Sequence, residues 1–313
     1  MPAMQITPRP LVGIACVIGA ATLWGTTGTS QALAGGNLSP AWFGALRLAF
    51  AAMFFLAFAA MTGATKRQAW KDLAPSDVVG AGLCMAVYNL AFFAGVRLTG
   101  VGIGTAIALG SGPIWAGLLQ AAFQRQMPTT AWWTGTGVAI VGGVLLSLGG
   151  GALTFSATGM LLCLAAGFSY AVYTLLNKRM VGRAPAASIT LGAFTLAALI
   201  SLPAAGLQAG MPAITVRELL AAAYAGLVTA GVGYLLFSHA LRHIAPATSV
   251  TLALTEPVVA YGLAALVLGE PTNATAVAGL ALVVSGVLGV VRVELTAVSR
   301  PVAPQGGGSA GRI

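Results

Sequence analysis

Four side chains that can carry charge or make several hydrogen bonds fall inside long apolar stretches: Arg47, Asn89, His239 and Glu256. Polar and ionisable groups are costly in a bilayer, so each is a candidate for binding or transport. The planar guanidinium of Arg47 can hold a carboxylate through two hydrogen bonds. Glu256 can carry a proton or bind an amine. His239 titrates near neutral pH when unperturbed. Arg47, His239 and Glu256 are therefore candidates for charge or proton coupling.

Each of these residues also has a purely structural interpretation. Arg47 can extend its charged end toward the membrane surface or pair with a backbone carbonyl. A protonated Glu256 can donate to the carbonyl that Pro257 leaves without its helical partner. His239, near the end of its stretch, can be an interfacial residue. Asn89 can bind a substrate or tie two helices together.

Aromatic side chains form a second group of candidates, because several lie within apolar stretches rather than at their ends. A Trp N–H or Tyr O–H inside a membrane needs a partner, and a substrate cavity provides one. Core packing is the alternative for each residue singly. The predicted substrate-binding set is Trp24, Tyr88, Asn89, Phe92, Trp115, Phe168, Tyr173 and Tyr234.

The composition of the chain places these candidates in a membrane protein. Of 313 residues, 58% are hydrophobic and 7% are charged. Soluble domains are nearer a quarter charged, so this chain cannot cover a water-facing surface. The net charge of +9 is explained by basic residues in cytoplasmic loops, and we expect a lipid bilayer and no nucleic acid as the partner. The three cysteines lie in apolar runs without metal-site spacing.

The sequence lacks the motifs of competing chemistries. It has no Gly-x-x-x-x-Gly-Lys-Ser/Thr loop for nucleotide phosphates and no His-Glu-x-x-His, and its Gly-x-Ser-x-Gly match at 307–311 lies in the glycine-rich tail, where it does not support a hydrolase. We therefore expect no enzyme activity, no catalytic residues, no cofactor and no metal.

Ten stretches are long enough to span a bilayer, which takes about 20 apolar residues. They are 11–34, 40–62, 78–98, 101–123, 131–149, 157–176, 188–208, 217–241, 245–268 and 274–293. The predicted fold is an all-α membrane protein with ten transmembrane helices. We expect a cytoplasmic segment at 1–10, five-helix repeats at 11–149 and 155–293, and a flexible cytoplasmic tail at 294–313.

The repeat is visible as a constant offset of 144 residues. This offset relates Pro113 to Pro257, Gly135 to Gly279, and Gly142 to Gly286. Each half therefore contains a helix with an internal proline, a polar turn and a glycine-lined helix. A proline inside a helix removes one hydrogen bond and bends it. Pro113 and Pro257 are predicted hinges, and static kinks are the alternative.

Charge predicts the orientation of the spans. If the N-terminus is cytoplasmic, twelve of the fifteen Lys and Arg residues lie on the cytoplasmic side, and only Arg97 and Arg217 lie opposite. This bias places both termini in the cytoplasm. Because each repeat has five spans, the two repeats must cross the membrane in opposite directions. Inverted repeats are typical of secondary transporters with a central binding site.

These features resemble the EamA-type exporters of the drug/metabolite transporter superfamily. The resemblance rests on Glu256-Pro257-Val258-Val259-Ala260, on Leu268-Gly269-Glu270-Pro271 and on Gly279 and Gly286. Ala21-Thr22-Leu23-Trp24-Gly25 and Arg47 also fit that pattern. Gln126 departs from it, since it stands where the second half has Glu270. The resemblance implies a ten-helix basket, alternating access and export of small metabolites such as amino acids.

The expected function is secondary active export of small metabolites across the inner membrane, with amino acids, including aromatic or other apolar ones, as the favoured substrates. A proton-coupled multidrug or other small-metabolite transporter and a non-transporting scaffold are the alternatives. A membrane enzyme would need clustered catalytic groups, and a channel would need a continuous polar stripe. The sequence leaves the oligomeric state open, and a monomer is compatible with it.

Overall fold

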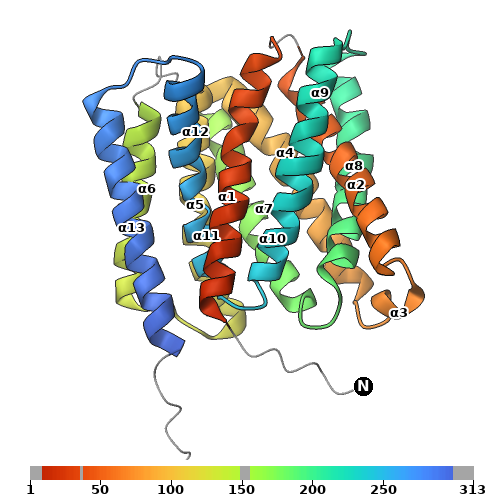
Figure 1. Ribbon diagram of the computed structural model, residues 1–313, viewed down its shortest axis with the longest axis horizontal. Coiled ribbons are helices and arrows are strands. Elements are labelled where there is room, and N and C mark those ends of the chain that lie inside the picture. The colour runs from red at the N-terminus through yellow and green to blue at the C-terminus, as the bar shows by residue number, and fades with distance from the viewer. Residues whose placement is uncertain (1–8, 36–37, 149–155, 299–313) are drawn as a thin grey trace, which may run out of the picture.

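The computed structural model describes residues 9–35, 38–148 and 156–298, and within these ranges all regular elements are helical (Figure 1). Ten helical segments are long and apolar enough to cross a membrane. The predicted all-α fold with ten spans is confirmed. The spans are α1 (Pro10–Leu33), α2 (Pro40–Thr62), α4 (Pro75–Thr99), α5 (Val101–Gln124), α6 (Thr130–Leu148), α7 (Ala157–Met180), α8 (Ala186–Ala209), an eighth and a ninth span in several pieces, and α13 (Ala274–Val298).

Two details of the chain differ from the sequence-based expectation. A short helix, α3 (Arg67–Trp70), lies in the connection between α2 and α4. The last helix continues to Val298, so it includes the first residues of the tail expected at 294–313. Its final turns are held because the Glu294 carboxylate accepts a 2.7 Å hydrogen bond from the Thr248 hydroxyl.

Helix ends follow local sequence signals. Ser39 caps α2 by accepting from the Trp42 N–H, and Pro40 occupies the first turn, where its missing donor costs nothing. Gly63 ends α2 with a φ of 72°, a conformation that favours glycine. Thr215 and Glu218 form a reciprocal capping box at the start of the eighth span.

The eighth and ninth spans are irregular. The eighth consists of α9 (Val216–Tyr224), a π-helical segment η1 (Ala225–Val232) and α10 (Gly233–Ala240). The ninth consists of α11 (Pro246–Leu252) and α12 (Thr255–Val267), with a break at Ala253 and Leu254. Pro257 lies in the first turn of α12, so the break precedes it. At the repeat-related Pro113, helix α5 runs without interruption.

The helix contacts are exchanged between the halves, as two related repeats require. Helix α1 packs on η1 and α10, the third span of the second half, and α7 packs on α4, the third span of the first half. The α2–α8 and α6–α13 pairs join equivalent spans. The α6–α13 seam shows the exchange in atomic detail. A Cβ atom at Gly142 would lie 2.6 Å from the Gly279 carbonyl oxygen, and one at Gly286 would lie 2.5 Å from that of Gly135.

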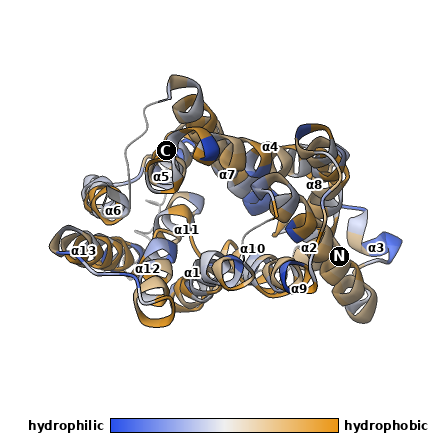
Figure 2. Cartoon of the chain, turned by 90° about the horizontal axis from the view of Figure 1, so that it is seen from above, coloured by the Kyte–Doolittle hydropathy of each residue, from blue (hydrophilic) through white to orange (hydrophobic). Residues whose placement is uncertain are grey.

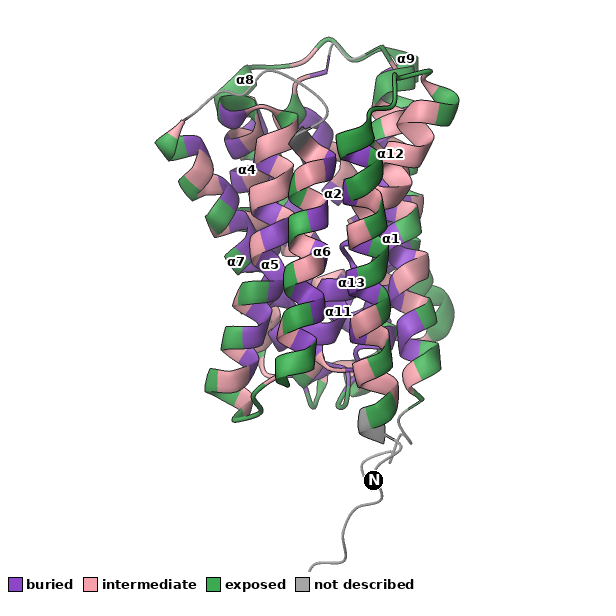
Figure 3. Cartoon of the chain, turned by 90° about the vertical axis from the view of Figure 1, so that its left-hand side faces the viewer, coloured by how far each residue is buried: buried purple, intermediate pink, exposed green. Residues whose placement is uncertain are grey.

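Viewed along the helices, the α6–α13 pair and the α2–α8 pair lie at opposite sides of the bundle, and the outward surfaces are mainly apolar (Figure 2). Buried positions concentrate on the inward faces (Figure 3). We call the end at which α1 begins the basic end, and the end at which α1 terminates the mouth end. The described basic residues at the basic end are Arg9, Lys66, Arg67, Lys71, Arg125, Lys178, Arg179, Arg183, Arg242 and Arg292.

Candidate binding cavity

A cavity of about 630 Å³ lies between the two halves. This volume falls within the roughly 300–1,000 Å³ of small-molecule sites. Its lining begins near the mouth end with Gln31 and Arg97 and extends to Trp24 and Tyr170, near the middles of their helices. Toward the basic end the chain is closed, since Tyr173 and Phe237 are fully buried. The cavity therefore communicates with one end of the bundle.

The cavity brings together six of the predicted residues from five spans. Helices α1, α2, α4, α10 and α12 contribute them. They are Trp24, Arg47, Tyr88, Phe92, Tyr234 and Glu256. Trp24 stacks at a tilt on Tyr234, with ring centroids 4.9 Å apart. Tyr88 lies against Tyr170 at 5.5 Å. The aromatic residues thus form a connected wall around two ionisable groups.

Three charged residues line the cavity, and the two deeper ones, Arg47 and Glu256, are not joined by an ion pair. Arg47 and Glu256 both line it, yet no ion pair within 4.0 Å joins them in the part of the chain that the structure describes. Each is close enough to Tyr234 for an electrostatic interaction. Arg47 and Glu256 also interact electrostatically with each other, and a cation and an anion in one cavity suit a ligand that carries both opposite charges.

Three buried polar atoms of lining residues have no hydrogen-bond partner among the described residues. They are Trp24 Nε1, Arg47 Nε and the Tyr170 hydroxyl. Buried polar atoms are normally satisfied by protein or water, so unpaired ones beside a cavity indicate what the cavity accepts. An N–H of Trp and an N–H of Arg can donate but not accept. The cavity therefore favours a ligand with hydrogen-bond acceptors, such as a carboxylate.

Two glycines set the backbone positions of Arg47 and Glu256. A Cβ atom at Gly226, in η1, would lie 2.7 Å from the Arg47 carbonyl oxygen. A Cβ atom at Gly25, in α1, would lie 2.8 Å from the Glu256 carbonyl oxygen. Side chains at either glycine would push α2 or α12 away, so both close approaches depend on the absent Cβ. Each charged residue is thus positioned by a glycine of the opposite half.

Three predicted aromatic residues lie outside the cavity lining. Trp115 and Phe168 pack edge to face at 5.4 Å, and Phe168 is 42% exposed on the outside of the bundle. Tyr173 is fully buried, and its hydroxyl accepts a hydrogen bond from Asn177. Tyr173 thus finds its partner in helix packing, whereas Trp115 Nε1 is buried without a hydrogen-bond partner among the described residues. The role of these three residues in substrate binding stays a prediction without support from the geometry.

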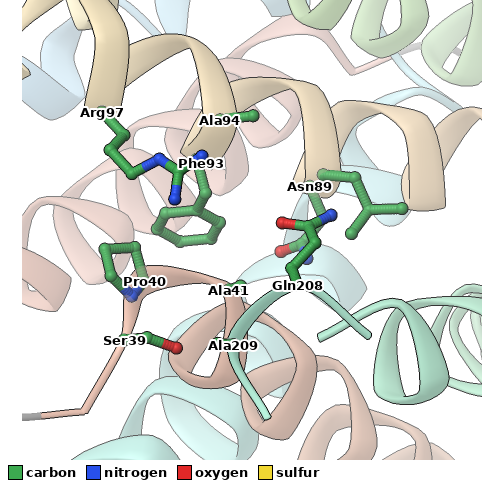
Figure 4. Close-up of a pocket in the computed structure, with 10 residues that line it drawn as sticks. Ser39, Pro40, Ala41, Asn89, Phe93, Ala94, Arg97, Gln208 and Ala209 are labelled. Atoms are coloured by element: carbon green, nitrogen blue, oxygen red, sulfur yellow. The ribbon is translucent and has the colours of Figure 1, made fainter. Parts of the chain in front are cut away.

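Asn89 lies behind the cavity, in a separate pocket of about 40 Å³ between α2, α4 and α8 (Figure 4). Gln208 lies close to it there, and Phe93 and Arg97 line both spaces. The Asn89 side-chain nitrogen is buried and has no partner among the described residues. A direct contact between Asn89 and a ligand in the main cavity stays a prediction.

His239 lies at the basic end, away from the cavity lining. Its Nε2 atom is 3.4 Å from Nε2 of His243, and His243 Nδ1 accepts from the backbone N–H of Arg9 at 3.4 Å. Burial and then the neighbouring positive charges lower the pKa of His243 below its ordinary value. This arrangement does not place His239 within reach of a ligand in the cavity.

The two predicted hinge prolines differ in their surroundings. Pro257 lines a small space beside the cavity, together with Thr105 and Leu254. Pro113 is buried within α5 and belongs to none of the spaces described here. Their roles as hinges stay predictions.

The candidate set drawn from the sequence missed Tyr170 and Arg97. Tyr170 was recognisable as a mid-span aromatic residue, but its neighbour Tyr173 carries the same signal and points into the core. Arg97 sits in the last turn of α4, where an arginine is ordinary at a membrane surface. The sequence offered no signal that it borders the cavity.

Comparisons with known proteins agree with this arrangement. A Bacillus subtilis protein named Uncharacterized transporter YwfM is 35% identical over 274 residues, which cover 87% of this chain and 91% of that protein. A Streptantibioticus cattleyicolor protein named Probable terminal-alkyne amino-acid exporter is 28% identical over 179 residues, 56% of this chain and 59% of that protein. These names describe transporters rather than enzymes.

A solved structure described as "Crystal structure of protein" matches with a TM-score of 0.76 at 20% sequence identity, covering 91% of this chain and 98% of that one. At this identity the match shows the fold. The model of the EamA-like transporter family matches residues 11–148 and 157–292, one match in each half of the bundle. Together with the ten apolar helices, these matches show that the chain is a multi-pass membrane protein that belongs to the EamA-like transporter family.

Proposed function

We propose that this protein is a secondary transporter that exports small metabolites, amino acids foremost, by alternating access. The observation that carries the proposal is that Arg47 and Glu256 share one cavity of about 630 Å³, and no ion pair within 4.0 Å joins them among the described residues. A zwitterion offers a carboxylate to Arg47 and an ammonium to Glu256. Charge-assisted hydrogen bonds of this kind are stronger than neutral ones.

The apolar part of the cavity supports amino acids with aromatic or other apolar side chains. Phe92, Leu109 and Val250 line the space beside the charged groups, and aromatic walls suit such side chains through offset or edge contacts. The relative from Streptantibioticus cattleyicolor is named a probable exporter of a terminal-alkyne amino acid. A terminal alkyne is an apolar group. The proposed ligand places its charged end at Arg47 and Glu256 and its side chain against this wall.

The positive-inside bias supports an inner-membrane orientation with both termini in the cytoplasm and the mouth end outside. Cysteines introduced at Gly35, at the mouth end, should react with an impermeant thiol reagent from outside, and one at Arg67 should not. Gly150, the other outer position expected from the sequence, lies outside the described residues. The two repeats, at 11–149 and 155–293, then run in opposite directions through the membrane.

A proton-coupled transporter of drugs or other small metabolites is the second candidate. Glu256 favours it, because a carboxylate inside a mainly apolar cavity can alternate between binding a proton and binding a cation. This function would accept cations without a carboxylate. Amino-acid export would require the carboxylate, so substrate competition separates the two.

The test is flux into vesicles that contain the purified protein and no nucleotide. Radiolabelled apolar amino acids should be transported saturably, and their amide or N-acetyl derivatives should compete poorly. Trp24→Ala should lower transport with folding retained, whereas Trp133→Ala, at a residue outside the cavity lining and the predicted binding set, is the matched control. Flux without any dependence on the ligand's carboxylate and amine would contradict the proposal.

A further inference from the structure

The connection between α10 and α11, residues 241–245, closes the bundle at the basic end (Figure 1). It is tightly packed, with Leu241 and Ile244 almost fully buried. The last carbonyls of one helix and the first N–H groups of the next meet here, and such groups have no partner inside their own helices. Side chains from three other spans provide those partners.

Lys178, near the end of α7, binds the end of α10. Its Nζ atom donates to the Leu241 carbonyl oxygen at 2.6 Å and to the Ile244 carbonyl oxygen at 3.1 Å. A cation beside the C-terminal carbonyls of a helix is also favoured by the helix dipole. Lys178 therefore attaches the C-terminal end of α10 to α7 at the basic end, where the cavity is closed.

Glu294 of α13 and Gln120 of α5 bind the start of α11. The Glu294 carboxylate accepts from the Ala245 N–H at 3.4 Å and from the Thr248 hydroxyl at 2.7 Å. The Gln120 side-chain oxygen accepts from the Ala247 N–H at 3.1 Å. Three hydrogen bonds thus attach the α10–α11 connection to α7 and α13, and two more attach the start of α11 to α5 and α13.

The mouth end lacks the counterparts of these three polar side chains. The same 144-residue offset relates Lys178 to Ala34 and relates Gln120 to Ala264, and alanine has no polar side-chain atom. Glu294 is related to Gly150, which lies outside the described residues and also lacks a side chain. At the equivalent α4–α5 connection, 97–101, the Thr99 hydroxyl donates to the Gly95 carbonyl of its own helix, and Cys163 of α7 is its side-chain neighbour from another span.

From this difference we propose that Gln120, Lys178 and Glu294 form a latch that holds the basic end closed. Opening the basic end separates the five bonded pairs, whereas the mouth end has no counterpart of these three polar side chains. The substrate-free protein therefore rests with its mouth open, and the latch must release before a ligand can enter from the basic end. This inference rests on the proposed alternating access. It adds the residues that shift the equilibrium between the mouth-open and the basic-end-open states.

Two cysteine reporters test the latch in a background where the three native cysteines are replaced. Ala247→Cys reports the basic end, because Ala247 is buried in the latched structure, and Thr105→Cys reports the cavity. Lys178→Met and Glu294→Gln should each speed maleimide labelling of the first reporter and slow labelling of the second. We expect changes of about fivefold or more, the lower end of typical effects on conformational equilibria.

Arg183→Met is the matched control, because Arg183 is an exposed cation close to Lys178 in the sequence, and it should label like the parent. Melting in detergent verifies that the latch variants are folded. Unchanged labelling at both reporters would overturn the latch. So would faster labelling of Ala247→Cys alone, which indicates local fraying, or an equal response in the control. No substrate is needed, so the result is independent of whether amino acids are transported.

A second consequence appears in transport. When a ligand binds one conformer, its apparent dissociation constant is the intrinsic one divided by that conformer's population. Latch variants that populate the basic-end-open state should therefore lower the apparent KM for ligand supplied at the basic end. An unchanged or higher KM in Lys178→Met, with labelling shifted as expected, would contradict the entry route while leaving the latch intact.

Discussion

The two halves of this protein share one architecture but differ in the fourth and ninth spans. In the first half, α5 runs continuously through Pro113. In the second, the chain breaks between α11 and α12, just before Pro257. Inverted repeats allow two states to be related by an exchange of shapes between halves. The uninterrupted and broken spans are the two shapes that such an exchange needs.

Chemistry distinguishes the halves even more clearly than backbone shape. The 144-residue offset relates Arg47 to Leu191 and Glu256 to Gly112. Latch residues likewise have alanine or glycine counterparts. A single central cavity needs one set of charged groups, whereas a conformational exchange needs two similar halves. The duplication therefore maintains the backbone, and the charged residues that line the cavity occur once.

The largest expected effect comes from giving Arg47 the side chain of its counterpart. Arg47→Leu should lower transport about ten- to hundredfold, because a hydrogen bond to a charged group contributes roughly 1.5–3 kcal/mol. Vesicle flux with an apolar amino acid measures it. Arg217→Leu, which removes a cation from outside the cavity lining, is the control. Wild-type flux in Arg47→Leu would show that the halves do not differ in this chemistry.

Substitutions at the glycines of the α6–α13 seam test the packing that the two halves share. Gly286→Leu and Gly142→Leu should destabilise the protein equally, by about 1–3 kcal/mol, as overpacked sites do. Each would drive a side chain into the backbone of the facing helix. Gly137→Leu, on α6, is the control, since a Cβ atom there meets nothing within 4 Å. Unfolding in detergent measures the losses, and clearly unequal losses at the two seam positions would break the symmetry argument.

The smallest effect is expected at the prolines. Pro257→Ala should slow transport roughly two- to fivefold with ligand affinity kept, a change of about 0.5–1 kcal/mol in a conformational step. Binding and flux measured on the same preparation separate the two quantities. Pro113→Ala should do less from the state seen here, because α5 is already continuous. A double variant with wild-type binding and flux would leave both prolines as static features of the packing.

The sequence alone determined the membrane class, the ten spans and the repeat. These features depend on composition and on spacing along the chain: apolar stretches must match the bilayer thickness, and turns, prolines and glycines recur at a fixed offset. Helix bounds mostly follow local signals as well, such as the caps at Ser39 and Gly63. Polar residues inside the spans were recognisable for the same reason, since the bilayer makes each one costly.

Tertiary structure alone decided which of those residues share a cavity. Tyr170 faces the cavity and Tyr173 faces the core, although both are mid-span tyrosines three residues apart. The spacing of apolar residues does not indicate which face of a span points to the cavity. A helix surrounded by lipid and other helices has no polar face to orient it. Nothing in the sequence indicated the latch either. Lys178 and Glu294 lie 116 positions apart, and only folding brings both to the α10–α11 connection.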